Sequence, residues 1–183
     1  MFKTKTFLIA LATALTAVAT PSVQASEIYD QHQSLWEDLE RVGVTIHVND
    51  PEACRSGSFQ GRYISRMRRL DVCQDNYVPY TQTQWTANDL DTLRHEAHHV
   101  VQDCNGLPYD SQLNKLFDGD EFREFVTSAL TEGQIKGVIE SYRAQGANDT
   151  VIELELEAFS VAQSVNADTI GRKVVEYCGV GKM

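Results

Sequence analysis

The sequence predicts an α+β fold, in which a small antiparallel or mixed sheet packs on one helix with the pattern HExxH, followed by a C-terminal helical lobe. Strand-like alternation of apolar and polar residues is confined to residues 44–73. Helical spacing of apolar residues covers most of the chain from Thr86 onward. With no internal repeat and no linker, we expect residues 26–183 to form one domain.

Residues 1–25 are typical of a signal peptide. Lys3 and Lys5 precede an apolar run over residues 7–20, and Ala25 closes a segment of small residues. The run is shorter than the roughly 20 residues that a membrane-spanning helix needs, which disfavours a retained anchor. We therefore expect cleavage before Ser26 and a secreted or periplasmic protein.

The charge of the chain excludes two classes of partner. The formal net charge is −10, and removing the two lysines of residues 1–25 leaves −12. Nucleic acids and anionic membranes both require a basic face. We expect no nucleic acid, no membrane after signal cleavage, and a monomer.

Four cysteines remain in the mature chain, and an even number in an exported protein favours disulfides. Of the three possible connectivities we favour Cys54 with Cys73 and Cys104 with Cys178. The first pair joins near neighbours, and the second joins the C-terminal region to the HExxH helix. A cysteine metal site is disfavoured because no C-x-x-C spacing exists.

The first half of the chain is predicted to form one helix and three strands. The helix covers residues 27–42, and a strand over residues 44–48 stops at Asn49-Asp50-Pro51. Residues 61–64 and 70–73 predict a hairpin around an arginine-rich turn.

The second half predicts only helices. Thr86, with Asp89 three residues later, is an N-cap signal for a helix that ends at Asn105-Gly106. Further helices are predicted over residues 121–130, 131–144, 150–165 and 168–178.

The helix that follows Thr86 carries the pattern His95-Glu96-Ala97-His98-His99. At roughly 100° per residue, His95, Glu96 and His99 share one narrow arc, away from the apolar face of the helix. Two histidines four residues apart can bind one metal ion, with Glu96 facing the water bound to it. His98 lies on the far side from Glu96, so we expect it to support the ligands or to lie at the surface.

A catalytic zinc ion requires a third protein ligand and an open position for water. Three glutamates that alternate with apolar residues on the helix over 150–165 are candidates: Glu153, Glu155 and Glu157. Because these glutamates recur at every second residue, a helix places them on different faces. At least one should therefore point inward, where a buried carboxylate needs a partner.

His95-Glu96-x-x-His99, followed by Glu155-x-x-Ala158 on a later helix, resembles the gluzincin branch of the zincin metallopeptidases. The resemblance implies a zinc metallopeptidase, with His95, His99 and Glu155 as metal ligands and Glu96 as the catalytic base. Glu157 is the alternative third ligand. Phe159 replaces the acidic residue usual after the alanine, so the support of the ligands should differ.

The mechanism implied is hydrolysis of a peptide bond in a peptide or protein substrate, with Glu96 moving a proton from the metal-activated water to the leaving amine. The resemblance also implies an edge strand that aligns the substrate, for which residues 70–73 are the candidate. The oxyanion would be stabilised by one of five tyrosines: Tyr77, Tyr80, Tyr109, Tyr142 or Tyr177.

Two other interpretations remain open. A non-catalytic binding module could hold a structural zinc ion, and His98 or Cys104 would then be a fourth ligand. In the other interpretation HExxH is a coincidence, and the chain is a metal-free interaction domain held by disulfides.

Overall fold

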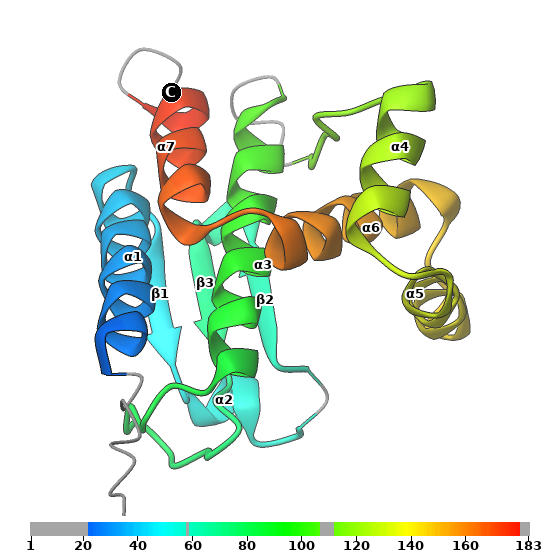
Figure 1. The fold of residues 1–183 in the computed structure, drawn as a ribbon. Coiled ribbons are helices and arrows are strands. Elements are labelled where there is room, and N and C mark those ends of the chain that lie inside the picture. Colours follow the sequence, from blue (N-terminus) through cyan, green and yellow to red (C-terminus); the bar gives the residue numbers. More distant parts are fainter. Residues whose placement is uncertain (1–21, 58, 107–111, 180–183) are drawn as a thin grey trace, which may run out of the picture.

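The structure is a computed structural model that describes residues 22–57, 59–106 and 112–179 (Figure 1). Its mixture of helices with a small mixed sheet and a helical C-terminal region confirms the predicted α+β class. In chain order the elements are α1 (Ser22–Arg41), β1 (Thr45–Val48), α2 (Pro51–Cys54), β2 (Gly61–Ile64), η1 (Ser65–Met67), β3 (Arg69–Val72), α3 (Ala87–Cys104), α4 (Gly119–Ala129), α5 (Glu132–Ala144), α6 (Asp149–Ser164) and α7 (Ala167–Cys178).

The predicted apolar run of the signal peptide lies outside the described residues. Helix α1 starts at Ser22, ahead of the predicted cleavage point before Ser26. No helix in the described part of the chain is both long and apolar enough to cross a membrane.

The sheet has the strand order β1-β3-β2, so β3 is its central strand. β1 runs parallel to β3 and β2 runs antiparallel to it, which confirms the predicted hairpin. Arg68 closes the hairpin in the left-handed region at φ 47°. The prediction that residues 70–73 form an edge strand was wrong, because both edges of β3 are hydrogen-bonded and β2 is the edge strand beside α3.

Residues 51–54, for which no helix was predicted, form the short helix α2. Asp50 caps it by accepting a hydrogen bond from the backbone N–H of Glu52, and Pro51 occupies its first turn. Proline suits that position because its fixed φ is helical and the missing N–H would have no helical partner there. Cys54 at the end of α2 reaches Cys73 directly after β3.

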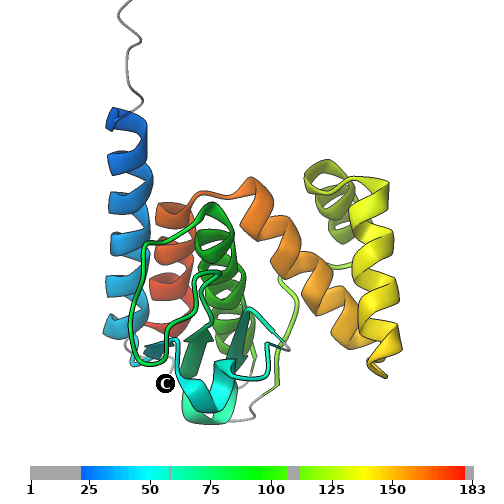
Figure 2. The same cartoon turned by 90° about the horizontal axis from the view of Figure 1, so that it is seen from below.

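The main core lies between the sheet and three helices. Helix α3 packs on β2 and β3, α1 packs on β1, and α7 contacts both α1 and α3 (Figures 1 and 2). Apolar side chains from these elements are almost fully buried, among them Leu35, Leu70, Val100 and Val174. The Cys104–Cys178 disulfide joins the ends of α3 and α7, so both predicted disulfides are confirmed.

Helices α4, α5 and α6 form a second group on the other side of α3 from α1 (Figure 2). Their shared cluster contains Phe122, Val126, Leu130, Ile152 and Leu156. Helix α6 joins the two groups, since it packs along α3 and contacts α4 and α5. The C-terminal helices therefore do not form one lobe, because α7 turns back and packs between α1 and α3.

Candidate metal centre

Helix α3 begins with a capping box and carries the HExxH pattern in its second half. The Thr86 side chain accepts a hydrogen bond from the Asp89 backbone, and the Asp89 carboxylate accepts one from the Thr86 backbone over 2.8 Å. Asp89 also accepts a hydrogen bond from the Asp75 backbone, which ties the helix start to the segment after β3. The predicted start and end of this helix are confirmed.

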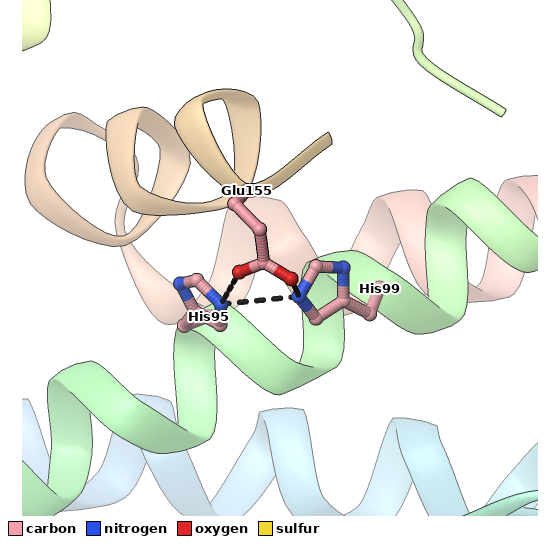
Figure 3. Close-up of side chains that lie close together, drawn as sticks. All are labelled: His95, His99 and Glu155. Carbon is pink, nitrogen blue, oxygen red and sulfur yellow. Dashed lines mark hydrogen bonds and ion pairs between the residues drawn. The ribbon is translucent and has the colours of Figure 1, made fainter. Parts of the chain in front are cut away.

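The side chains of His95, His99 and Glu155 converge between α3 and α6 (Figure 3). The two histidine Nε2 atoms lie 3.0 Å apart. One carboxylate oxygen of Glu155 lies 3.1 Å from Nε2 of His95, and the other lies 3.5 Å from Nε2 of His99. These three residues could hold a metal ion.

The three glutamates of α6 have different partners. Glu155 alone among them reaches the two histidines, because Glu153 pairs with Lys115 and Glu157 lies against His98. The Glu157 carboxylate accepts hydrogen bonds from the side chains of His98 and Gln102 and from the backbone N–H groups of residues 116 and 117. Glu157 is therefore already surrounded by donors from the protein.

The separations within the cluster suit a tetrahedral zinc ion. Ligands about 2.0–2.1 Å from zinc at tetrahedral angles lie roughly 3.3 Å from one another. The two Nε2 atoms lie 3.0 Å apart, and each lies 3.1 to 3.5 Å from a different carboxylate oxygen of Glu155, while one ligand atom from each residue can be chosen within 4.8 Å of the others. Two imidazole nitrogens and one carboxylate are also the ligand types of known catalytic zinc sites.

The electrostatics of the cluster favour a bound cation. Burial raises the pKa of the Glu155 carboxyl, but hydrogen bonds from His95 and His99 outweigh burial and hold it far below its usual range. Burial lowers the pKa of His95 to about 4. Burial also disfavours a charged His99, but Glu155 and Glu96 outweigh it and raise its pKa to about 9. The charge of Glu155 thus favours a positive charge beside it, which a proton on His99 or a metal ion could supply.

Glu96 lies beside the cluster and faces the edge strand. Burial raises the pKa of Glu96 to about 7, against a hydrogen bond from the backbone of Tyr63 in β2. Its Oε2 atom is buried and has no hydrogen-bond partner among the described residues. A buried carboxylate oxygen without a donor, next to a candidate metal site, is where a proton-accepting group for water is expected.

Close packing between β2 and α3 depends on Gly61. A Cβ atom at this position would lie 2.5 Å from Cγ2 of Thr92 and 2.8 Å from Oε1 of Glu96. Any larger residue would therefore push the strand away from Glu96.

Tyr142 of α5 also reaches the cluster. Its hydroxyl donates a hydrogen bond to Oε2 of Glu155 over 2.7 Å. Burial and the charge of Glu155 raise the pKa of the Tyr142 hydroxyl, so it remains a proton donor at neutral pH. Of the five tyrosines proposed as oxyanion donors, Tyr109 lies outside the described residues, and of the described four Tyr142 alone lines the cleft.

A cleft of about 350 Å³ opens beside His95 and Glu96. Residues 59–61, which lead into β2, line the cleft, as do Tyr142 of α5 and Gln145 directly after that helix. His95 and Glu96 are largely buried, but both line this cleft from α3, so a substrate that entered it would lie beside both side chains.

The two histidines are supported differently. Nδ1 of His99 is hydrogen-bonded to Oε1 of Gln102 over 2.7 Å. The ring of His95 packs edge-on against the ring of Phe159, with 4.4 Å between the ring centroids. The buried Nδ1 atom of His95 has no hydrogen-bond partner among the described residues. Phe159 therefore supports the first histidine by packing, where the resemblance would place an acidic residue.

His98 and Cys104, the candidate fourth ligands, are each bound to another residue. His98 is buried, so the surface alternative was wrong, and its Nε2 contacts Glu157 over 2.8 Å. Cys104 is bonded to Cys178. Neither side chain completes the coordination sphere of the cluster.

Sequence reasoning missed Gln102 and Gly61. Gln102 follows His99 by three residues on one helix, and side chains at that spacing are neighbours, so the pattern HxxQ was an available signal. For Gly61 there was no such signal, because Glu96 and Thr92 approach it only after the sheet has packed on α3.

Comparisons with known protein families, with curated proteins and with solved structures found no match for this chain.

Proposed function

We propose that this chain is an exported zinc metallopeptidase that hydrolyses peptide bonds with Glu96 as general base. The observation that carries the proposal is the convergence of His95, His99 and Glu155 at a cleft, beside a buried carboxylate oxygen of Glu96 that has no hydrogen-bond partner among the residues the structure describes. Two histidines and one carboxylate leave the fourth position of a tetrahedral zinc ion open, as catalysis requires.

When bound, a zinc ion would supply a Lewis acid that activates a water molecule and polarises the scissile carbonyl. Glu96 accepts the proton of that water and delivers it to the leaving amine. A carboxylate with a pKa of about 7 suits both steps, since it exchanges a proton readily near neutral pH.

Tyr142 is the proposed donor to the oxyanion that develops on the scissile carbonyl. Its hydroxyl remains protonated, lies 2.7 Å from Oε2 of Glu155, and belongs to a residue that lines the cleft. A positioned donor of this kind stabilises the tetrahedral intermediate.

Strand β2 is the proposed site of substrate alignment. It has no strand partner on its outer edge within the described residues, and Gly61 brings it against Glu96. An extended peptide can add to such an edge through backbone hydrogen bonds. The substrate is therefore proposed to be an extended segment of a peptide or protein.

The proposed location is outside the cytoplasm, in the periplasm or the surrounding medium. The two disulfides and the predicted signal peptide support export, because disulfides persist in oxidising compartments. We propose a monomer that acts without nucleic acid or membrane.

The first test measures zinc content and hydrolysis of casein and of peptides. We expect about one zinc ion per chain in the wild type. Glu96→Gln should keep the zinc and lose hydrolysis, whereas Glu153→Gln on α6, which disrupts only the pair with Lys115, should keep both. A wild-type protein with neither bound zinc nor activity after zinc addition would overturn the proposal. Bound zinc without hydrolysis in the wild type would instead support the non-catalytic module.

A further inference from the structure

We propose that Gln102 is a positioning residue that prepares His99 for the metal and ties it to the helix that carries Glu155. This inference rests on the proposed zinc site. It concerns affinity for the metal rather than hydrolysis itself.

Gln102 is fully buried between α3 and α6, and both ends of its amide are hydrogen-bonded. Its Oε1 atom lies 2.7 Å from Nδ1 of His99. Its Nε2 atom donates to the backbone carbonyl of Leu154 and to Oε1 of Glu157, each over 3.1 Å. The amide therefore links the second histidine to the residue that directly precedes Glu155.

The orientation of the amide follows from its partners. A backbone carbonyl can only accept, so the amide group facing Leu154 must be the NH₂ group. Oε1 of Gln102 then faces His99 and can only accept, so Nδ1 of His99 must keep its proton. The ring nitrogen of His99 that remains for a metal ion is consequently Nε2, which lies 3.0 Å from Nε2 of His95.

Glu157 holds the amide in this orientation. Its carboxylate also accepts hydrogen bonds from His98 and from the backbone N–H groups of residues 116 and 117, at 2.8 to 3.2 Å. With donors from α3 and from the segment before α4, the Glu157 carboxylate is fixed in place. Rotation of the Gln102 amide would place its oxygen against that carboxylate and against the Leu154 carbonyl.

His95 has no comparable support. Its Nδ1 atom lacks a hydrogen-bond partner in the described part of the chain, and its ring packs against the ring of Phe159. Hydrogen bonds to the outer nitrogen of a metal-binding histidine fix the ring and raise its affinity for the metal. Loss of Gln102 should therefore weaken the site more than loss of an equally buried glutamine elsewhere.

The test compares Gln102→Met with Gln74→Met in the full mature protein. Methionine keeps the approximate volume and removes the amide. Gln74 is also buried, but its amide binds Asn49, directly after β1, and Thr83, in the loop after β3, and none of the three lines the metal centre. Zinc affinity is measured by competition with a chromophoric chelator, the visible spectrum of the cobalt-loaded protein reports ligand geometry, and Tm is measured without metal.

We expect the zinc Kd of Gln102→Met to rise by about 10- to 100-fold, with an altered cobalt spectrum. Gln74→Met should lower the metal-free Tm but leave the zinc Kd and the cobalt spectrum unchanged. Gln102→Asn, whose shorter amide cannot span both partners, should weaken zinc binding in the same direction and serves if the methionine variant does not fold.

Wild-type zinc binding with an unchanged Kd in both Gln102 variants would overturn this inference and leave the proposed function standing. An equal loss of affinity in Gln74→Met would also overturn it, since the effect would then be one of stability. If the wild type binds no zinc, the proposed function fails and this inference fails with it.

Discussion

The hydroxyl of Tyr142 lies 2.7 Å from a carboxylate oxygen of Glu155, so helix α5 contacts the candidate metal centre through this side chain. Helix α5 has no buried residues of its own and packs on α6. Tyr142 is thus placed where it can act on the substrate and can also steady Glu155.

Replacing Tyr142 with phenylalanine separates these two roles. If Tyr142 stabilises the oxyanion, Tyr142→Phe should lower kcat by about 10²- to 10³-fold, with zinc content and KM little changed. Steady-state kinetics with a peptide substrate and zinc analysis measure both. Tyr80→Phe, at an exposed residue, is the matched control and should behave as wild type. Zinc loss in Tyr142→Phe would assign the hydroxyl to support of Glu155 instead.

The two inward glutamates of α6 should respond in opposite ways to substitution. Glu155→Gln should lose zinc, because it weakens one of three proposed ligands. Glu157→Gln should keep its zinc Kd within about tenfold of the wild-type value. Its free energy of unfolding should fall by about 2–4 kcal/mol, because an amide cannot accept from all the donors that surround the buried carboxylate. Zinc analysis and urea unfolding of the metal-free proteins measure the two effects. Zinc loss confined to Glu157→Gln would make Glu157 the ligand.

Gly61→Ala should disturb Glu96, the proposed catalytic base, through a single added methyl group. The new Cβ would meet Thr92 and Glu96 at 2.5 and 2.8 Å, so we expect a loss of about 1–3 kcal/mol in stability and reduced kcat. Gly137→Ala in the interior of α5 is the control, since a Cβ there meets nothing within 4 Å. The free energy of unfolding of that control should rise by about 0.5–1 kcal/mol. Wild-type stability and kcat in Gly61→Ala would show that β2 does not hold Glu96.

The two disulfides should contribute unequally to stability. Cys104 and Cys178 are 74 residues apart in sequence, and Cys54 and Cys73 are 19 apart. Because the longer loop removes more entropy from the unfolded chain, replacing Cys104 and Cys178 with serine should cost about 1 kcal/mol more than replacing the other pair. Urea unfolding of the metal-free double variants tests this. Equal losses would point to native-state effects in place of loop entropy.

Several features of the fold followed from local sequence alone. The start of α3 was predictable because the Thr86–Asp89 capping box lies within four residues and satisfies its own backbone groups. The hairpin of β2 and β3 was predictable for the same reason, since its two strands and turn are adjacent in sequence. The position of β3 in the middle of the sheet was not, because its pairing with β1 joins residues more than twenty positions apart.

The candidate ligand pair of the HExxH pattern was visible in the sequence because one helical turn brings His95 and His99 together whatever surrounds the helix. The place of Glu155 beside them, the engagement of Glu157 by His98, and the approach of Tyr142 required the folded chain. These contacts join α3, α5 and α6, and side-chain packing between the helices sets them. Local periodicity specifies which residues share a helix face, whereas the packing of one face on another decides which carboxylate meets the histidines.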